Sequence, residues 1–154
     1  SRKPLCSSCP LNTVCIANER SIQLERPVRK KKKARKKRYF HWLLCQEDDS
    51  ILIEKRTQKD IWQGMYHLPL IEKQDSSKPE KKELKKLFPE GELIKKDLSL
   101  NEKLKQTLSH QKIIGIIYNS PFPDAFPDSY LKVSASEINN YAIPGILRRY
   151  FSSK

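Results

Sequence analysis

The chain has 154 residues and a formal net charge of +13 at pH 7, with 32% charged and 37% hydrophobic residues. This length allows one domain with its own core together with an arm or a linker. No apolar run approaches the roughly 18 residues that a membrane span needs, and the N-terminal residues lack the apolar core of a signal peptide. We therefore expect an intracellular protein with no membrane partner.

Three of the four cysteines, Cys6, Cys9 and Cys15, lie within the first 15 residues. Thiolates separated by such short loops can ligate one soft metal centre, and close cysteine runs are typical of iron–sulfur and zinc sites. Because Cys45 stands apart in an apolar run, metal ligation is favoured over disulfides. Three thiolates do not complete such a site, so we expect a fragment whose fourth ligand lies upstream.

Positive charge is concentrated in residues 29–38, where nine of the ten positions are basic, which leaves about +4 for the rest of the chain. A solvated linker is one interpretation of this basic tract. We favour the other, a contact with DNA or RNA, because dense positive charge attracts a polyanion by releasing its condensed counterions. The basic residues of the tract are Arg29, Lys30, Lys31, Lys32, Lys33, Arg35, Lys36, Lys37 and Arg38.

The composition divides the chain into three segments. Residues 1–16 are expected to form a loop around the metal, with almost no core of its own. Residues 17–38 are polar and basic, with Pro27 among them, and are interpreted as a connector. The folded domain is expected to occupy residues 39–154.

The folded domain should begin with a β-hairpin. Residues 39–45 are apolar and aromatic, residues 51–53 are apolar, and residues 47–50 supply turn-forming side chains between them. A third strand or extended segment is predicted at 65–70. Pro69 places that segment at an edge or an end of the sheet, because proline cannot donate a ladder hydrogen bond.

A helix is predicted after this strand. Its entry is expected at residues 76–78, with Pro79 in the first turn. Leu84, Leu87 and Phe88 would lie on one face, which indicates packing against the sheet.

Further strands are predicted at 92–98, 103–108 and 111–118, with a bend at 107–110 that joins the last two. The strand at 111–118 is rich in β-branched residues, which suits a buried position. A shorter strand is expected at 130–133.

The chain should end with two helices on a mixed sheet. Ser134 and Glu137 form a capping-box pattern for a short helix, and a final helix is expected from Pro144. The sequence thus predicts an α+β domain. The final-helix residues expected to pack on the sheet are Ile146, Leu147 and Tyr150.

The cysteine spacing matches the last three ligands of the pattern Cys-x6-Cys-x2-Cys-x5-Cys, which holds a [4Fe–4S] cluster in DNA glycosylases of the helix-hairpin-helix superfamily. Residues 3–11 and 15–17 resemble the cluster loop of the adenine DNA glycosylases of the MutY family. Arg56, residues 61–66 and residues 68–69 resemble the R…LWGGLWEFP segment of that family.

Two further motifs of the MutY family follow in the same order. Leu108-Ser109-His110 lies where the family has its Phe-Ser-His loop, and residues 141–144 resemble its YALP-like segment. The shared order of these motifs identifies the chain as similar to the C-terminal portion of a MutY-type enzyme.

This resemblance implies a Nudix-like, or MutT-like, mixed sheet with flanking helices, preceded by the cluster loop and the basic connector. It implies an enzyme that removes adenine opposite 8-oxoguanine, with base flipping into an N-terminal catalytic domain. That domain is absent from the 154 residues, so no catalytic residue is assigned in this fragment, which we expect to be non-catalytic alone. The cluster would belong to the full-length protein, and we expect it to be absent or incomplete here.

The resemblance also implies a lesion-reading site at Leu108, Ser109 and His110, with a contact from Arg56. A serine hydroxyl both donates and accepts hydrogen bonds, which suits the C8 carbonyl and N7–H donor of 8-oxoguanine. Leu108 replaces the family's usual phenylalanine, so only apolar contact is expected there. Arg56 would contact phosphate or brace its own loop.

The implied partner is duplex DNA that contains an 8-oxoguanine:adenine mispair, bound by a monomer in the cytoplasm of a bacterium, at the nucleoid. Two alternatives stay open: a zinc-containing nucleic-acid-binding module and a Nudix nucleotide pyrophosphohydrolase. An active Nudix enzyme would carry an R-E-x-x-E-E helix whose carboxylates bind magnesium. The corresponding segment 79–87 has only Glu80 and Glu83, outside that pattern, which argues against hydrolysis.

Overall fold

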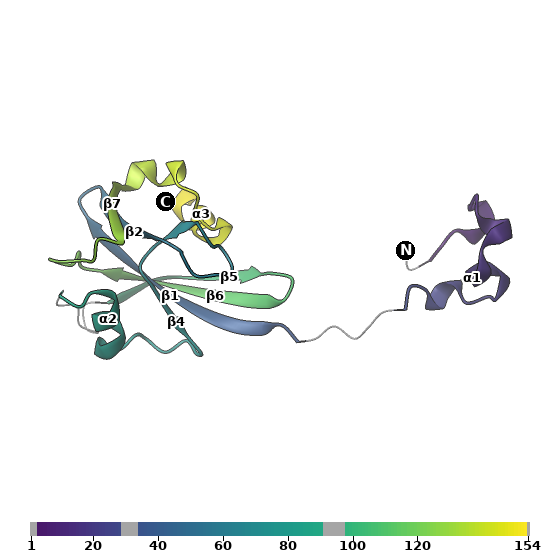
Figure 1. Ribbon diagram of the computed structural model, residues 1–154, viewed down its shortest axis with the longest axis horizontal. Coiled ribbons are helices and arrows are strands. Elements are labelled where there is room, and N and C mark those ends of the chain that lie inside the picture. Colours follow the sequence, from purple (N-terminus) through teal and green to yellow (C-terminus); the bar gives the residue numbers. More distant parts are fainter. Residues whose placement is uncertain (1–2, 29–33, 91–97, 154) are drawn as a thin grey trace. The chain divides into compact units, whose positions relative to one another are not determined.

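The computed structural model describes residues 3–28, 34–90 and 98–153 of the chain. The contacts divide the chain into two compact units, Ser1–Ala34 and Arg35–Lys154 (Figure 1). None of the described helices is both long and apolar enough to cross a membrane.

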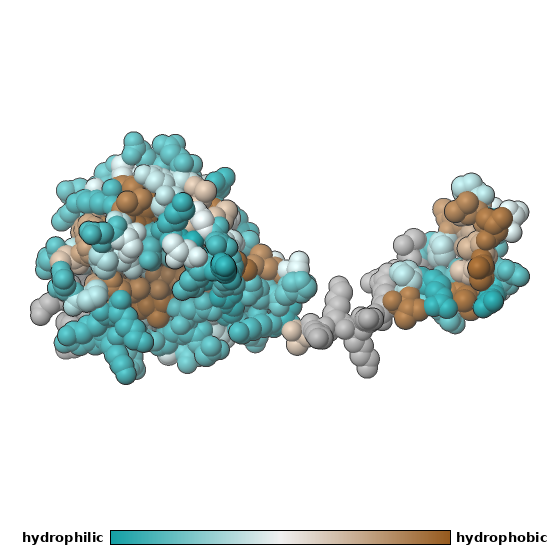
Figure 2. All heavy atoms as spheres, viewed as in Figure 1, coloured by the Kyte–Doolittle hydropathy of each residue, from teal (hydrophilic) through white to brown (hydrophobic). Residues whose placement is uncertain are grey.

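The first unit consists of short helical turns. They are η1 (Cys6–Ser8), η2 (Asn12–Val14), α1 (Ile16–Glu19) and η3 (Gln23–Glu25). None of these elements contains a buried residue, and Figure 2 shows several apolar residues at the surface of this unit. Its exposed apolar residues include Leu5, Leu11, Val14, Ile16, Leu24 and Val28. The described part of this unit therefore has almost no core.

Within its described residues, the second unit is built on a seven-stranded sheet with the order β3-β2-β1-β6-β5, to which β4 adds on β1 and β7 on β2. Strands β1 and β6 run parallel, and the other paired strands run antiparallel. The mixed sheet that the sequence predicted is thereby confirmed. The strands are β1 (Lys36–Glu47), β2 (Ser50–Lys55), β3 (Tyr66–His67), β4 (Leu70–Lys73), β5 (Ser99–Thr107), β6 (Gln111–Ser120) and β7 (Tyr130–Ser134).

Helices cover both faces of the sheet (Figure 1). Helix α2 (Lys81–Leu87) places Leu84 on the face that contains Leu43, and Phe88 at its C-terminal end joins the same cluster. On the opposite face, η5 (Ala135–Asn140) and α3 (Gly145–Ser152) pack against the cluster that contains Trp42. Side chains that alternate along β1 thus supply two separate cores. The α3 residues that join the second core are Ile146, Leu147 and Tyr150, as predicted.

Five expectations about the elements need correction. Strand β5 begins at Ser99, before the expected start at residue 103, because its first residues pair with the end of β6. Strand β1 begins at Lys36, before the expected start at Tyr39, because its first residues pair with β6. The third strand is divided into β3 and β4 around Leu68 and Pro69, since proline lacks the N–H that a ladder requires. The segment after Ser134 is a 3-10 helix, in which the Ser134 hydroxyl accepts a hydrogen bond from the Ser136 amide.

Helix α2 also begins later than expected. Its N-cap is Glu80, whose side chain accepts a hydrogen bond from the Glu83 amide, while the Glu83 side chain accepts one from the Glu80 amide. This reciprocal capping box replaces the expected entry at 76–78. The strand predicted at 92–98 lies almost wholly outside the described residues.

Candidate nucleic-acid interface

The Leu108-Ser109-His110 segment forms the turn between β5 and β6, as the sequence predicted. The Leu108 amide donates a hydrogen bond to the Gln111 carbonyl at 2.8 Å, which closes the turn. Leu108 is half-buried and packs against the core that contains Trp42, whereas Ser109 and His110 are exposed. The turn therefore presents two polar side chains on an apolar anchor.

The C-terminal end of the basic tract lies beside this turn. The Lys36 amide donates to the His110 carbonyl at 3.3 Å, and the parallel register then pairs Lys37 with Lys112. Two features that are more than 70 positions apart in the sequence thus meet at one end of the sheet. Residues 29–33 of the tract, namely Arg29, Lys30, Lys31, Lys32 and Lys33, lie outside the described residues.

Arg38, the last residue of the basic tract, is not available as a free cation. Its Nε donates to Glu72 Oε1 at 2.6 Å, and its Nη1 donates to Asp60 Oδ1 and Gln111 Oε1, each at 3.0 Å. The hydrogen bonds that Arg38 donates, first to Glu72 and then to Asp60, raise the pKa of Arg38, and the guanidinium holds the pKa of Asp60 well below its usual range. Only 11% of the Arg38 side chain is exposed. Through the hydrogen bonds above, this residue joins three elements together.

The sequence left two roles open for Arg56, a phosphate contact and the bracing of its own loop. In the structure, Arg56 braces its loop. It is 5% exposed, and its Nη2 donates to Asp60 Oδ2 at 3.0 Å. Its backbone amide donates to Met65 O at 2.8 Å, and its carbonyl accepts from the Gly64 amide at 2.7 Å. The guanidinium also lies 5.6 Å from the centre of the Phe40 ring. A phosphate contact would require Arg56 to leave these partners.

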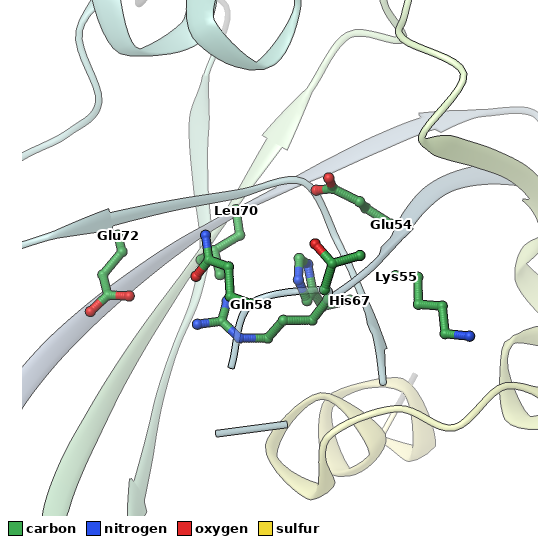
Figure 3. Close-up of a pocket in the computed structure, with 8 residues that line it drawn as sticks. Glu54, Lys55, Gln58, His67, Leu70 and Glu72 are labelled. Atoms are coloured by element: carbon green, nitrogen blue, oxygen red, sulfur yellow. The ribbon is translucent and has the colours of Figure 1, made fainter. Parts of the chain in front are cut away.

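A cavity of about 150 Å³ lies over β2, β3 and β4, close to Arg56 (Figure 3). Glu54 and Glu72 lie on opposite sides of it, with His67 between them. His67 is buried, and its Nδ1 lies 2.8 Å from the Leu68 carbonyl oxygen. Burial lowers the pKa of His67 and raises the pKa of Glu54, because it disfavours the charged form of each group.

The carboxylates of helix α2 are both engaged within the protein. Glu80 and Glu83 form the capping box, and Glu83 Oε2 also accepts a hydrogen bond from Lys73 Nζ at 3.0 Å. Within residues 3–28, 34–90 and 98–153, no group of three or more His, Cys, Asp or Glu side chains is arranged to hold a metal ion.

The cysteines of the first unit do not form such a group either. Cys6, Cys9 and Cys15 are free thiols, with Cys6 at the start of η1 and Cys15 at the N-cap of α1. In the described part of the chain, these three thiols are not gathered into a group that could hold a metal ion. The iron–sulfur cluster therefore stays a prediction from the cysteine spacing and the resemblance.

Residues 41–153 match the NUDIX domain family. The chain belongs to this family. The mixed sheet with helices on both faces is accordingly a Nudix fold, as predicted.

Solved structures similar to this Nudix domain include MutT from Methanosarcina mazei Go1, with a TM-score of 0.57 and 16% identity over 79% of this chain and 95% of that one. The E. coli ORF135 protein has a TM-score of 0.58 and 12% identity over 77% and 88%, respectively. The C-terminal domain of mouse MUTYH, crystallised with human PCNA, has a TM-score of 0.58 and 15% identity over 75% and 85%. At these identities, the likeness shows the fold alone.

Sequence reasoning missed two sets of residues in this Nudix domain. The partners of Arg38 could not be found, because Glu72 is 34 positions away and no local pattern links the two. Lys103 and Lys105 could have been found from their alternation with Leu104 and Gln106 along one predicted strand.

Proposed function

We propose that this chain is the C-terminal region of an adenine DNA glycosylase of the MutY family. It binds duplex DNA and reads the 8-oxoguanine opposite the adenine that a separate catalytic domain excises. The observation that carries the proposal is the position of the Ser109 and His110 side chains: both are exposed on a turn whose His110 carbonyl is bonded to Lys36 of the basic tract.

The turn can supply both donors and acceptors to a modified base. The Ser109 hydroxyl can accept from N7–H of 8-oxoguanine or donate to its C8 carbonyl, and ordinary guanine offers neither group. His110 adds a ring nitrogen beside it. Leu108 keeps the turn on the core, so that these polar groups are held on a fixed support.

The state of helix α2 supports DNA binding over nucleotide hydrolysis. Capping and the Lys73 contact occupy the Glu80 and Glu83 carboxylates, whereas a magnesium site needs carboxylate oxygens that are free to bind the ion. In the whole protein, we propose Cys6, Cys9 and Cys15 as three ligands of a [4Fe–4S] cluster. No step of lesion reading depends on this cluster.

The test compares binding of two duplexes by the 154-residue chain, one with 8-oxoguanine opposite adenine and one with guanine opposite adenine. We expect the wild-type chain to prefer the first duplex. The double variant Ser109→Ala/His110→Ala should lose that preference while it still binds both duplexes through the basic tract. An unchanged preference in the double variant would refute the proposed reading site.

Nucleotide hydrolysis is the second candidate, which the family match and the charged cavity near His67 favour. In this reaction, water attacks a nucleoside triphosphate, and a monophosphate and pyrophosphate leave. The measurement is pyrophosphate release from an oxidised guanine nucleotide with Mg²⁺. Release that disappears in a Glu54→Gln variant would favour this candidate over DNA reading.

A further inference from the structure

One face of the sheet carries lysines from three neighbouring strands. The register places Thr107, Lys112 and Lys37 in one row across β5, β6 and β1, and places Lys105, Ile114 and Tyr39 in the next row of the same face. Lys103, a further two positions along β5, points to this face as well. We call Lys37, Lys103, Lys105 and Lys112 the lysine face.

Packing fixes the side of the sheet on which the lysine face lies. Ile114 packs against the core that contains Leu43 and Leu84, so its row faces the side that helix α2 covers. Figure 1 shows α2 toward one end of the sheet, whereas β1, β5 and β6 continue beyond it toward the turn at 108–110. The lysines therefore lie on the part of this face that α2 leaves open.

The side chains of the lysine face are accessible. Lys37, Lys103 and Lys105 are exposed, and Lys112 is half-buried. Tyr39 and Ile114, which lie between them, are half-buried and supply apolar surface. Lysine stems packed beside such residues keep their ammonium groups at the surface.

Strand alternation separates these cations from the nearby carboxylates. Glu102 pairs with Ile117, whose side chain belongs to the opposite core, and Glu72 pairs with Phe40 of that same core. Those acids, together with Arg38, thus lie on the other face. In the described part of the chain, none of the four lysines forms an ion pair. On this side of the sheet, Glu83 is paired with Lys73 of β4, so the four lysines keep unpaired positive charge.

We infer that the lysine face binds the phosphate backbone of duplex DNA next to the base that the turn reads. Lysines two positions apart on a strand are about 6.6 Å apart, and neighbouring strands are about 4.8 Å apart. Phosphates follow one another every 3.4 Å along the axis of one DNA strand, so the face spans a few phosphates. This inference rests on the proposed function, because the turn at Ser109 identifies DNA as the polyanion.

The experiment measures the salt dependence of binding between the full chain and a duplex with 8-oxoguanine opposite adenine. The test variant is Lys103→Gln/Lys105→Gln/Lys112→Gln. The control variant removes the same charge elsewhere, from Lys132 of β7, which is paired with Glu47, and from two arginines of α3, which packs on the opposite face: Lys132→Gln/Arg148→Gln/Arg149→Gln. Circular dichroism and thermal unfolding confirm that both variants are folded, and the single variant Lys105→Gln serves if the triple variant does not fold.

Each lost phosphate contact lowers the slope of log K against log salt by about 0.9. Between 50 and 200 mM salt, the wild-type chain should thus lose about 40-fold more affinity than the test variant, which lacks three contacts. The single variant should change the slope by about 0.9, and the control should keep the wild-type slope. A test variant with the wild-type slope would overturn the inference.

Two further arms separate the possible failures. The lysine-face variant should weaken binding to the 8-oxoguanine and guanine duplexes by the same factor, because phosphates carry no sequence information. If the lysine-face variant weakens both complexes equally while Ser109→Ala/His110→Ala leaves the lesion preference intact, the inference about the lysine face is supported. The proposed reading site is then refuted. Vesicles of anionic lipid test another partner: loss of vesicle binding with unchanged DNA binding would refute the DNA assignment.

Discussion

Arg38 and Glu72 form an ion pair in which Nε of the guanidinium lies 2.6 Å from Oε1 of the carboxylate. The pair joins β1 to β4, and the same guanidinium reaches Asp60 in the loop after β2 and Gln111 at the start of β6. Because Gln111 directly follows His110, this network lies directly at the base of the proposed reading turn.

Replacement of Arg38 by glutamine should lower the free energy of unfolding by about 2 kcal/mol, because it removes the charged donor of Glu72 and one of the two charged donors of Asp60. The measurement is urea denaturation at pH 7. Lys37→Gln is the matched control, since Lys37 is the exposed neighbour on the same strand and should change stability by less than about 0.5 kcal/mol. Equal effects of the two variants would contradict the role of Arg38.

Asp60 should make the stability of the domain sensitive to acid. Its pKa is lowered in the folded protein, chiefly by the hydrogen bond from Arg38, so its contribution is complete above the pKa of about 3.9 of an unfolded aspartate. The contribution is lost progressively as the pH falls below that value. The stability difference between the wild type and Asp60→Asn should therefore shrink between about pH 5 and pH 2.5.

Denaturation curves across this pH range provide the measurement for Asp60. Asp124→Asn is a suitable control, because Asp124 is exposed and forms no ion pair in the described residues. Its stability should stay parallel to that of the wild type. A constant difference between the wild type and Asp60→Asn at all pH values would show that the carboxylate is not held by Arg38.

Local sequence patterns predicted most elements of the second unit but not the way they meet. The apolar run at 39–45 and the β-branched run at 113–117 are strands because alternating or continuous apolar side chains suit a buried sheet. That these two runs pair in parallel, with Lys37 opposite Lys112, depends on contacts far apart in the sequence. No local pattern encodes that register.

The candidate site, too, could be predicted from the sequence only in part. The turn at Ser109 and His110 was predictable, because it separates two strand patterns and resembles a known loop. The burial of Arg56 against Phe40 was not, since a lone arginine after a strand has the same local pattern whether it faces solvent or the core. Its bracing contacts depend on the tertiary structure, and its contact with phosphate stays a prediction.

Gly115 is required for the close approach between β6 and Trp42. A Cβ atom at this position would lie 2.5 Å from Cζ3 of Trp42, which is fully buried and cannot move away freely. Gly115→Ala should therefore lower the free energy of unfolding by about 1–3 kcal/mol through overpacking. Gly145→Ala is the control, because nothing lies within 4 Å of its added Cβ.

A second substitution tests the cause of the Gly115 effect. If the clash with the indole is responsible, Trp42→Phe should cost less stability in the Gly115→Ala background than in the wild type. A double-mutant cycle would then show a favourable coupling between the two positions. If the two losses of stability are additive, the strain in Gly115→Ala does not come from the contact with Trp42.

Glu83 should act on stability through the cap of helix α2 and not through metal binding. Glu83→Ala removes the hydrogen bond to the Glu80 amide at 2.9 Å and the ion pair with Lys73, which should cost about 1 kcal/mol. The loss should be the same with Mg²⁺ or with a chelator present. Lys82→Ala, on the exposed side of the same helix, should stay within about 0.5 kcal/mol of the wild type. If Mg²⁺ instead stabilised the wild type but not Glu83→Ala, helix α2 would retain a metal site, and the hydrolase candidate would gain over DNA reading.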